Sequence, residues 1–250
     1  DVYKSLNIIG AGALTTCIIP PEMDDSIDCT ASNVTIQSFT ITSISGYAAV
    51  FLDKANNCIV SGNIITGKGG GITLKGSNDN TVSGNRIHWV PGNGIHIIDS
   101  SLRNKVNENI LDRNHYGIFV ANASNYNIVS DNLVNSSDLS GIRLNWLGAG
   151  FAPVEFNNIT DNNVCYNHEG ILLDYPSNNN LVNDNMASDN HMGIRVRQSN
   201  NTTIVSNTVI SNTYRGISAE SSNGNVIYDN FLNNTNNAWD DGVNFWNVTK

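Results

Sequence analysis

The sequence is short of charge. Of its 250 residues only 14% are Asp, Glu, Lys or Arg, against about 25% in an average soluble domain. The 22 acidic residues outnumber the 13 basic ones, which gives a formal charge of −9. A protein that binds nucleic acid through its phosphates needs a basic surface, so this balance argues against a nucleic-acid partner. No run of about 18 apolar residues is present, and we expect no membrane-spanning helix.

Sulfur is scarce as well, with four Cys and three Met. The cysteines Cys17, Cys29, Cys58 and Cys165 form no CxxC pair, which excludes a zinc ribbon. Cys17 and Cys29 bracket a proline-containing segment, and they are expected either to form one disulfide or to be two buried thiols. The first residue is Asp1 rather than Met, and we expect an upstream targeting segment to have been removed.

What the sequence has in excess is Asn, with 43 residues, together with an internal repeat. A Gly followed by Ile or Val recurs at intervals of 23, 23, 24, 29, 23, 23 and 26 residues. These glycines are Gly71, Gly94, Gly117, Gly141, Gly170, Gly193, Gly216 and Gly242. A period of 20 to 50 residues is typical of solenoids and other repeat folds.

Each repeat contains three short segments in which apolar and polar residues alternate. In the repeat that holds Gly94, the apolar residues are Val82, Ile87, Ile95 and Ile97. Alternation over so few, largely β-branched residues predicts strands rather than helices. Three strands per turn of about 23 residues predict an all-β, right-handed parallel β-helix. About nine turns, at about 4.8 Å each, would make a rod about 45 Å long.

The asparagines fall into two columns of the repeat. One column is Asn63, Asn85, Asn109, Asn132, Asn162, Asn185, Asn207 and Asn230, and the other is Asn80, Asn104, Asn127, Asn157, Asn180 and Asn225. Asn tolerates the left-handed backbone of tight corners, and stacked amides form hydrogen-bonded ladders. We expect both columns to be architectural.

Two segments that begin and end with column asparagines, 127–132 (NIVSDN) and 180–185 (NLVNDN), are followed by Gly-Ile strands. In these segments the chain resembles the NosD-like, carbohydrate-associated β-helix family of exported archaeal and bacterial proteins. The opening segments 5–12 and 31–36 resemble the early coils of that family. The resemblance implies an extracellular or cell-surface protein. Its members include sugar-binding proteins, enzymes that cleave or epimerise polysaccharides, and noncatalytic surface proteins. With three Met and no His/Met/Cys cluster, we expect no copper site and identify no other cofactor motif.

Scarce charged residues gather beside the Gly-Ile strand, which holds four of the five His and four of the seven Arg. Arg binds carboxylates in bidentate fashion, and a local basic patch on an acidic chain suits an acidic polysaccharide. A base and a charge-neutralising Arg would be the minimum for a lyase or epimerase, and two carboxylates for a hydrolase. The catalytic candidates are His168, His191, Arg195 and Asp174. The candidates for substrate binding are His96, Arg143, Asn145, Trp146, Tyr175, Arg197, Arg215 and Glu220.

Plainer interpretations stay open. Asp174, Arg197 and Glu220 alternate in sign along one column and would equally form a structural charge ladder. Two stacked histidines, His168 and His191, lack a third metal ligand. An insertion at 146–156 brings further aromatic residues, which line a sugar groove or fold back onto the rod.

We therefore predict one β-helix domain over 1–250, with irregular coils at 1–45, regular coils at 46–250 and an insertion loop at 146–156. The function predicted is that of a noncatalytic surface module that binds polysaccharide. The alternatives are a polysaccharide lyase, epimerase or hydrolase, and a purely structural subunit. Because residues 1–6 form no capping helix, the first turn is expected to be completed by upstream sequence or by end-to-end self-association.

Overall fold

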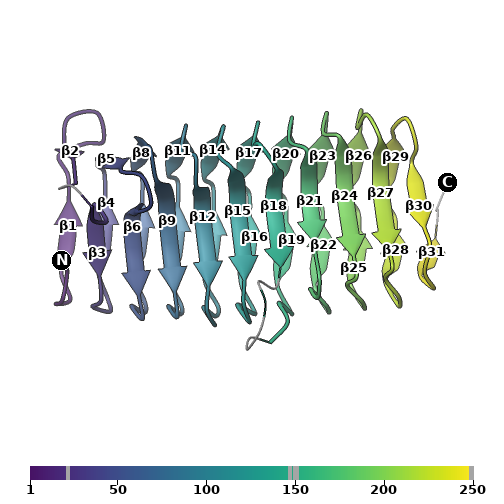
Figure 1. The fold of residues 1–250 in the computed structure, drawn as a ribbon, viewed down its shortest axis with the longest axis horizontal. Coiled ribbons are helices and arrows are strands. Elements are labelled where there is room, and N and C mark those ends of the chain that lie inside the picture. Colours follow the sequence, from purple (N-terminus) through teal and green to yellow (C-terminus); the bar gives the residue numbers. More distant parts are fainter. Residues whose placement is uncertain (21–22, 146–147, 149–151, 248–250) are drawn as a thin grey trace.

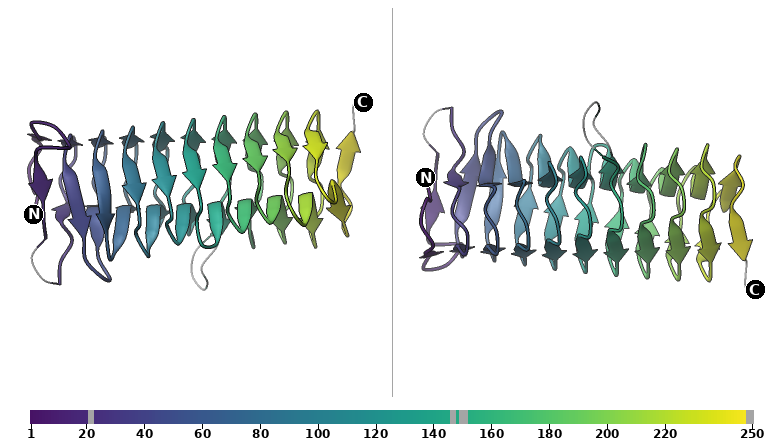
Figure 2. Two further views of the ribbon diagram at one scale, coloured as in Figure 1. Left: turned by 90° about the horizontal axis from the view of Figure 1, so that it is seen from above. Right: turned by 90° about the horizontal axis from the view of Figure 1, so that it is seen from below.

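The computed structural model describes residues 1–20, 23–145, 148 and 152–247, and over these the chain winds into a straight rod of stacked turns. The N- and C-terminal residues lie at opposite ends of the rod (Figure 1), and each turn contributes one strand to each of three long sides (Figure 2). The described residues form 31 strands and no helix. The predicted parallel β-helix is confirmed.

The strands form three parallel sheets, which we call sheets I, II and III in the order in which each turn enters them. Sheet I contains β1 (Asn7–Ile9), β4 (Thr35–Gln37), β7 (Ile59–Ser61), β10 (Thr81–Ser83), β13 (Lys105–Asn107), β16 (Ile128–Ser130), β19 (Asn158–Thr160), β22 (Leu181–Asn183), β25 (Thr203–Val205), β28 (Val226–Tyr228) and β31 (Phe245–Asn247). Sheet II contains β2 (Cys17–Ile18), β5 (Thr40–Ser43), β8 (Ile64–Gly67), β11 (Arg86–His88), β14 (Ile110–Asp112), β17 (Leu133–Asn135), β20 (Asn163–Cys165), β23 (Met186–Ser188), β26 (Thr208–Ile210) and β29 (Phe231–Asn233). Sheet III contains β3 (Ile27–Cys29), β6 (Ala48–Asp53), β9 (Gly70–Lys75), β12 (Asn93–Ile98), β15 (Tyr116–Ala121), β18 (Ser140–Asn145), β21 (Glu169–Leu173), β24 (Met192–Arg197), β27 (Arg215–Glu220) and β30 (Ala238–Asp240).

Equivalent residues of successive turns stack in register along the interior. Ile95 pairs with Ile72 on one side and Ile118 on the other, and all three side chains are fully buried. One turn alone would leave its apolar row exposed, whereas stacked turns bury one continuous core. The repeat of about 23 residues is therefore the length of one turn.

The repeated glycines are required because adjacent turns approach closely at this point. A Cβ added to Gly117 would lie 2.5 Å from the carbonyl oxygen of Gly141 and would overlap the Val134 side chain. Any larger residue would push the two turns apart. From Gly71 to Gly216 the Gly-Ile pattern thus marks the start of the sheet III strand and its contact with the next turn. The prediction is wrong for Gly242, which lies between β30 and β31, because Asn237 takes the equivalent position before Ala238.

The two predicted asparagine columns form the hydrogen-bonded ladders expected of them. Asn162 donates its side-chain amide to Asn185 Oδ1 at 2.9 Å and accepts from the Asn132 side chain at 3.0 Å. The left-handed backbone, however, falls on the residue before each ladder asparagine, such as Asp161 at φ 56° and Asp184 at φ 55°. The corner conformation and the ladder are thus divided between two adjacent residues.

Two further ladders were not predicted from the sequence. Asn114, Ser137, Asn167, Asn190, Asn212 and Asn234 form a third column at the corner between sheets II and III. Serines form a fourth, in which the backbone N–H of one turn donates to the hydroxyl of the next, as from Ser77 to Ser101. Ser137 interrupts the asparagine pattern of the third column, which hides it in the sequence.

In the insertion at 146–156, one described residue is buried in the core and another is exposed at the surface. Trp146 and Phe151 lie outside the described residues. Val154 is fully buried in the main core. Phe156 is 48% exposed and stacks on Tyr126 of the preceding turn, with ring centroids 5.3 Å apart.

Both ends of the described rod expose apolar side chains. Leu14 and Ile19 are 91% and 75% exposed in the first turn, and Val243 and Phe245 are 72% and 62% exposed in the last. Completion of the first turn by further sequence or by another subunit stays a prediction. No helix among the described residues is long and apolar enough to cross a membrane.

Candidate functional site

The strands of sheet III from β6 to β27 are the longest described strands and present a wide outward surface, which we call the outer face. β24 and β27 span six residues each, whereas their neighbours β25 and β26 span three. Strand side chains point alternately inward and outward, so that equivalent outward residues stack in columns. The column two residues after the repeated glycines is Thr73, His96, Phe119, Arg143, Leu172, Arg195 and Ser218, and by register it continues to Trp239 in β30.

A first ion-pair network surrounds Asp174, which directly follows β21. Arg197 donates Nε and Nη2 to the two carboxylate oxygens of Asp174, at 2.7 Å each, and Arg143 Nη2 donates to Oδ2 at 2.9 Å. Burial raises the pKa of Asp174, but the hydrogen bonds and charge of Arg197, with the charge of Arg143, outweigh it and lower the pKa below its usual value. Asp174 is therefore held as a carboxylate.

A second network joins Glu169, Arg195, Glu220 and Arg215. Arg195 donates to Glu169 Oε1 at 3.3 Å and to Glu220, and Arg215 donates to the other oxygen of Glu220 at 3.1 Å. The side chains of Arg195, Arg215 and Glu220 are only 16–17% exposed. Such half-buried pairs hold both partners in fixed positions.

These networks divide the predicted catalytic residues. Arg195 belongs to the second network and Asp174 to the first. The expected charge ladder forms between Asp174 and Arg197, whereas Glu220, expected as its third member, bonds to Arg195 and Arg215 instead. The sequence pattern identified the residues of this cluster but not how they pair.

The predicted catalytic histidines lie at the edge of the outer face, where the chain enters sheet III. The rings of His168 and His191 have centroids 4.9 Å apart, and His191 stacks on Tyr214 at 5.2 Å with an interplanar angle of 10°. His168 Nδ1 lies 3.4 Å from Glu169 Oε2. The three rings form an exposed aromatic edge next to the second network.

Aromatic rings also cover the arginines. The Arg143 guanidinium lies 5.1 Å from the centroid of the Tyr116 ring and donates to its hydroxyl. The Arg215 guanidinium lies 4.7 Å from the Tyr214 ring and 4.2 Å from the Trp239 ring. Cation–π contacts of this kind fix the plane of the guanidinium. Neither Tyr116 nor Trp239 was predicted from the sequence as a site residue, although Tyr116 directly precedes a repeated glycine, as Glu169 and Arg215 do.

His96 lies between Thr73 and Phe119 in the central column. Its ring stacks on Phe119 at 5.1 Å with an interplanar angle of 10°, and its Nε2 is buried without a hydrogen-bond partner. Burial lowers the pKa of His96 to about 4. The imidazole is therefore neutral over the ordinary pH range, with one nitrogen not engaged by the protein.

The remaining predicted binding residues are less closely integrated. Asn145 ends β18 and is buried, with 8% of its surface exposed. Tyr175 directly follows Asp174 and is 49% exposed, and its backbone N–H donates to Asp174 Oδ1 at 3.0 Å. Trp146 lies outside the described residues.

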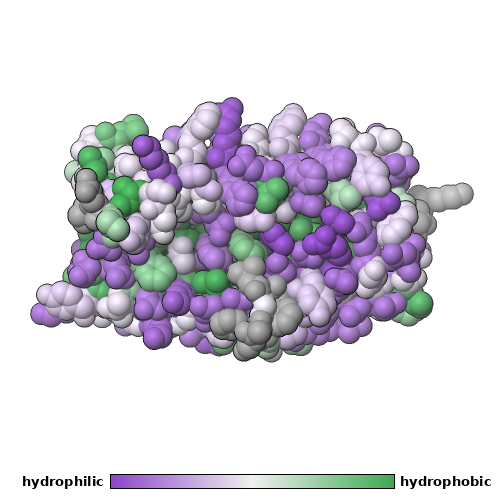
Figure 3. Space-filling model, viewed as in Figure 1, coloured by the Kyte–Doolittle hydropathy of each residue, from purple (hydrophilic) through white to green (hydrophobic). Residues whose placement is uncertain are grey.

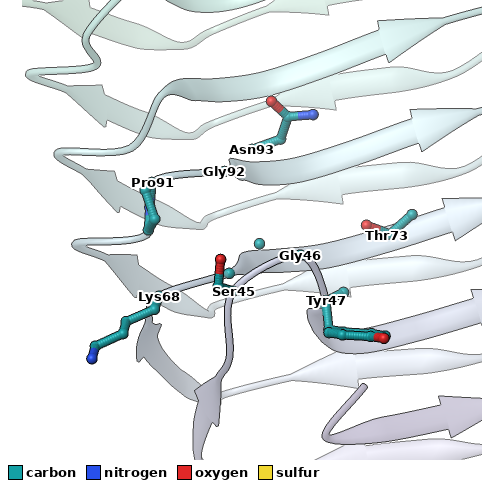
Figure 4. A pocket seen from close by; sticks show the side chains of 11 residues that line it. Ser45, Gly46, Tyr47, Lys68, Thr73, Pro91, Gly92 and Asn93 are labelled. Carbon is teal, nitrogen blue, oxygen red and sulfur yellow. The ribbon is translucent and has the colours of Figure 1, made fainter. Parts of the chain in front are cut away.

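A groove of about 390 Å³ opens at the N-terminal end of the outer face. In Figure 4, Lys68 and Pro91 lie toward one side of it and Tyr47 and Thr73 toward the other. Four glycines, Gly46, Gly69, Gly70 and Gly92, also line it. Because Thr73 is the register neighbour of His96, the groove leads onto the central column. Figure 3, viewed as Figure 1, shows hydrophobic residues scattered among hydrophilic ones on this side of the rod.

Two family models match the chain. Residues 114–250 match the family described as periplasmic copper-binding protein (NosD), and residues 24–166 match the family described as right-handed beta helix region. A comparison with curated proteins finds no significant match. Among the residues that the structure describes, no group of three or more His, Cys, Asp or Glu side chains is placed to hold a metal ion. These residues do not fit a copper site.

Solved structures of β-helix enzymes superpose on the whole rod at low sequence identity. The A-module of the mannuronan C-5 epimerase AlgE6 from Azotobacter vinelandii is 15% identical, with a TM-score of 0.73 over 96% of this chain and 84% of that one. The periplasmic alginate epimerase AlgG is 16% identical, with a TM-score of 0.63 over 98% and 74%. An alginate lyase from Paenibacillus sp. is 14% identical, with a TM-score of 0.65 over 91% and 89%. At this level of identity the likeness concerns the fold.

Proposed function

The chain belongs to the NosD and right-handed β-helix families, and from this premise we propose that it binds an acidic polysaccharide along the outer face of sheet III without cleaving it. The observation that carries this proposal is the gathering of Arg143, Arg195, Arg197 and Arg215 with aromatic rings on one side of a chain of formal charge −9. We further propose that the protein acts outside the cytoplasm, as the description of the NosD family as periplasmic suggests.

The ion pairs leave the arginines able to take a ligand. Each guanidinium has five N–H groups and uses only some of them on protein carboxylates. Arg197 keeps 42% of its side chain exposed while Asp174 fixes its position. A uronate carboxylate can then bind to a guanidinium already held in place, which reduces the entropy lost on binding.

The same contacts argue against a glycoside hydrolase. That chemistry needs one carboxyl group with a raised pKa to protonate the leaving group. Asp174 has a lowered pKa and is held by two arginines. Glu169 and Glu220 are likewise paired with arginine. The carboxylates of the outer face therefore serve to hold the arginines.

One observation favours a second candidate, a polysaccharide lyase or epimerase. His96 offers a neutral imidazole with an unpartnered nitrogen, and Arg143 lies two turns along the same column. A base that abstracts the proton next to a uronate carboxylate, beside an arginine that neutralises that carboxylate, is the minimum for β-elimination or epimerisation. In this candidate His96 replaces His168 and His191 as the base.

The test is a panel of polyuronates and neutral polysaccharides, with binding and turnover measured on the same samples. We expect binding to polyuronates only. Changing Arg143, Arg195 and Arg197 together to Ala should abolish it, whereas changing Arg86, Arg103 and Arg113, which removes the same charge elsewhere, should not. Equal losses in both triple variants, with both folded by circular dichroism, would contradict the proposal.

Turnover decides between the two candidates. Ultraviolet absorbance detects the unsaturated uronate of a lyase, and NMR of the polymer detects epimerisation. We expect neither signal. Either one, if it is lost in His96→Ala while binding is kept, would establish the enzyme instead. Binding to no polysaccharide at all would favour the purely structural subunit.

A further inference from the structure

Two cysteine side chains meet in the core near the N-terminal end of the rod. Cys29 ends β3 and Cys58 directly precedes β7, and they are 0% and 1% exposed. Both sulfurs lie within hydrogen-bonding distance of the same acceptor, the carbonyl oxygen of Ala31, at 3.3 Å from Cys29 Sγ and 3.4 Å from Cys58 Sγ. The two sulfurs therefore lie on one carbonyl group, at the corners of neighbouring turns.

Cys58 occupies the place of a ladder asparagine. One turn later, the Asn80 side-chain amide donates to the carbonyl oxygen of Ala55, just as the Cys58 thiol donates to that of Ala31. The Cys58 backbone N–H also donates to Asn80 Oδ1 at 2.7 Å, as ladder residues do. An asparagine would satisfy every hydrogen bond that Cys58 makes in this column. The thiol thus adds a reactivity that the architecture does not need.

The pair is chemically asymmetric. The hydrogen bond from the Cys29 thiol lowers the pKa of Cys58 to about 7, and the same contact raises the pKa of Cys29. A thiolate is the form that attacks disulfides. By contrast, Cys17 is exposed in β2 and Cys165 is half-buried in β20, where burial raises its pKa. All four cysteines are free in the structure, and the Cys17–Cys29 disulfide considered from the sequence is not formed.

We propose that Cys29 and Cys58 form a disulfide when the chain folds in the presence of a thiol–disulfide oxidant. The Cys58 thiolate attacks one sulfur of the oxidant, whose S–S bond breaks and releases a thiolate. Cys29 then attacks the Cys58 sulfur of this mixed disulfide, and the second oxidant thiolate leaves. The two cysteines lose two electrons and two protons, and the oxidant disulfide becomes two thiols.

The position explains what such a bond would do. It would link the corner after β3 to the corner before β7, and so join the first turns of the rod. In β1 the side chains of Asn7 and Ile9 are exposed, and Leu14 and Ile19 of the same turn are also exposed. Few buried contacts make a terminal turn prone to local opening. A cross-link that closes residues 29–58 into a loop would oppose that opening.

The experiment refolds the reduced full chain in a mixture of reduced and oxidised glutathione, because both sulfurs are buried once the rod has formed. After alkylation and digestion, mass spectrometry should find the peptide with Cys29 joined to the peptide with Cys58, lighter by two hydrogen atoms, and Cys17 and Cys165 alkylated. The melting midpoint should be higher by about 5–10 °C in the oxidised than in the reduced chain. Recovery of Cys29 and Cys58 as free thiols, or a link to Cys17, would overturn the proposal.

Cys58→Asn is the matched variant, since an asparagine restores the ladder and removes the thiol. It should give no link, and oxidant should no longer raise its melting midpoint, while Cys165→Ser should behave as wild type. A rise in the midpoint that persists in Cys58→Asn would contradict the assignment. If Cys58→Asn does not fold, the peptide map of the wild-type chain still decides the matter.

Discussion

Sheet III and sheet I are built from the same turns and the same buried aliphatic residues, yet their outward sides differ sharply. On sheet III, four arginines, three carboxylates and several aromatic rings form half-buried networks. At the corner before sheet I, the pair Arg103–Asp79 has the same bidentate geometry as Arg197–Asp174 but stands in solvent, with side chains 54% and 40% exposed. Stacking dictates the inward residues of every sheet and leaves the outward ones free to vary, so the outer face of sheet III is where function can be added.

Two consecutive asparagines should show the largest difference between an inward and an outward position. Asn162 directly precedes β20 and Asn163 is its first residue. Asn162 is 2% exposed, and its side chain donates to Val129 O, Thr160 O and Asn185 Oδ1 at 2.8–2.9 Å. Asn162→Ala should lower the free energy of unfolding by about 3 kcal/mol, because several buried groups lose their partners at once. Asn163 is exposed, and Asn163→Ala should leave stability unchanged in denaturant titrations. Equal effects of the two changes would show that the ladder does not hold the turns together.

Two glycines of sheet III strands that lie two turns apart test the close approach of the backbone. A Cβ at Gly117 would lie 2.5 Å from Gly141 O, whereas one at Gly70, which lines the groove, would lie 3.6 Å from Asn93 O. We expect Gly117→Ala to cost about 2 kcal/mol through overpacking and Gly70→Ala to cost almost nothing. Thermal unfolding of both variants measures this difference. A stable Gly117→Ala would mean that the turns are not held as closely as we describe.

The two Arg–Asp pairs, Arg197–Asp174 and Arg103–Asp79, should differ in how their contributions to stability depend on pH. The pKa of Asp174 is lowered in the folded chain, so its stabilisation is complete above the pKa of an unfolded Asp and is lost as the pH falls through the folded value. Asp174→Asn should cost about 1 kcal/mol at neutral pH, discounted for the exposure of Arg197, and the cost should vanish in acid.

Asp79 provides the control for that prediction. Its pKa is also lowered, by the hydrogen bond from Arg103, but both groups are exposed and solvent screens their attraction. Asp79→Asn should therefore leave stability unchanged within the error of denaturant titrations at every pH. A pH-independent loss in Asp174→Asn would refute the role of its charge.

The sequence was sufficient for the fold because the fold rests on repetition. The spacing of the glycines and of the flanking Ile and Val residues predicts three strands per turn, and the structure confirms this in all three sheets. The columns through Asn63 and Asn80 were visible because they are nearly uninterrupted. The column through Ser137 and Asn190 was missed because a hydroxyl takes the place of an amide in it.

The candidate site was predictable only as a region. The columns beside the Gly-Ile strand correctly brought Arg143, Arg195 and Arg197 onto one face. Which carboxylate each arginine binds depends on side-chain lengths and directions across two or three turns. The pattern of residues in the repeat does not determine these directions. The burial of His96, and with it the neutral state of its ring, likewise follows from the bulk of Phe119 beside it.

The most direct test of the central claim, that sheet III carries the binding surface, is a titration of Arg197→Ala and Arg103→Ala with a polyuronate oligosaccharide by calorimetry. The two changes remove the same charge and the same type of ion pair, one from the outer face of sheet III and the other from the corner before sheet I. We predict that Arg197→Ala weakens binding about tenfold, as expected for the loss of a charge-assisted hydrogen bond, and that Arg103→Ala binds as wild type does. Equal affinities for the two variants would contradict the account.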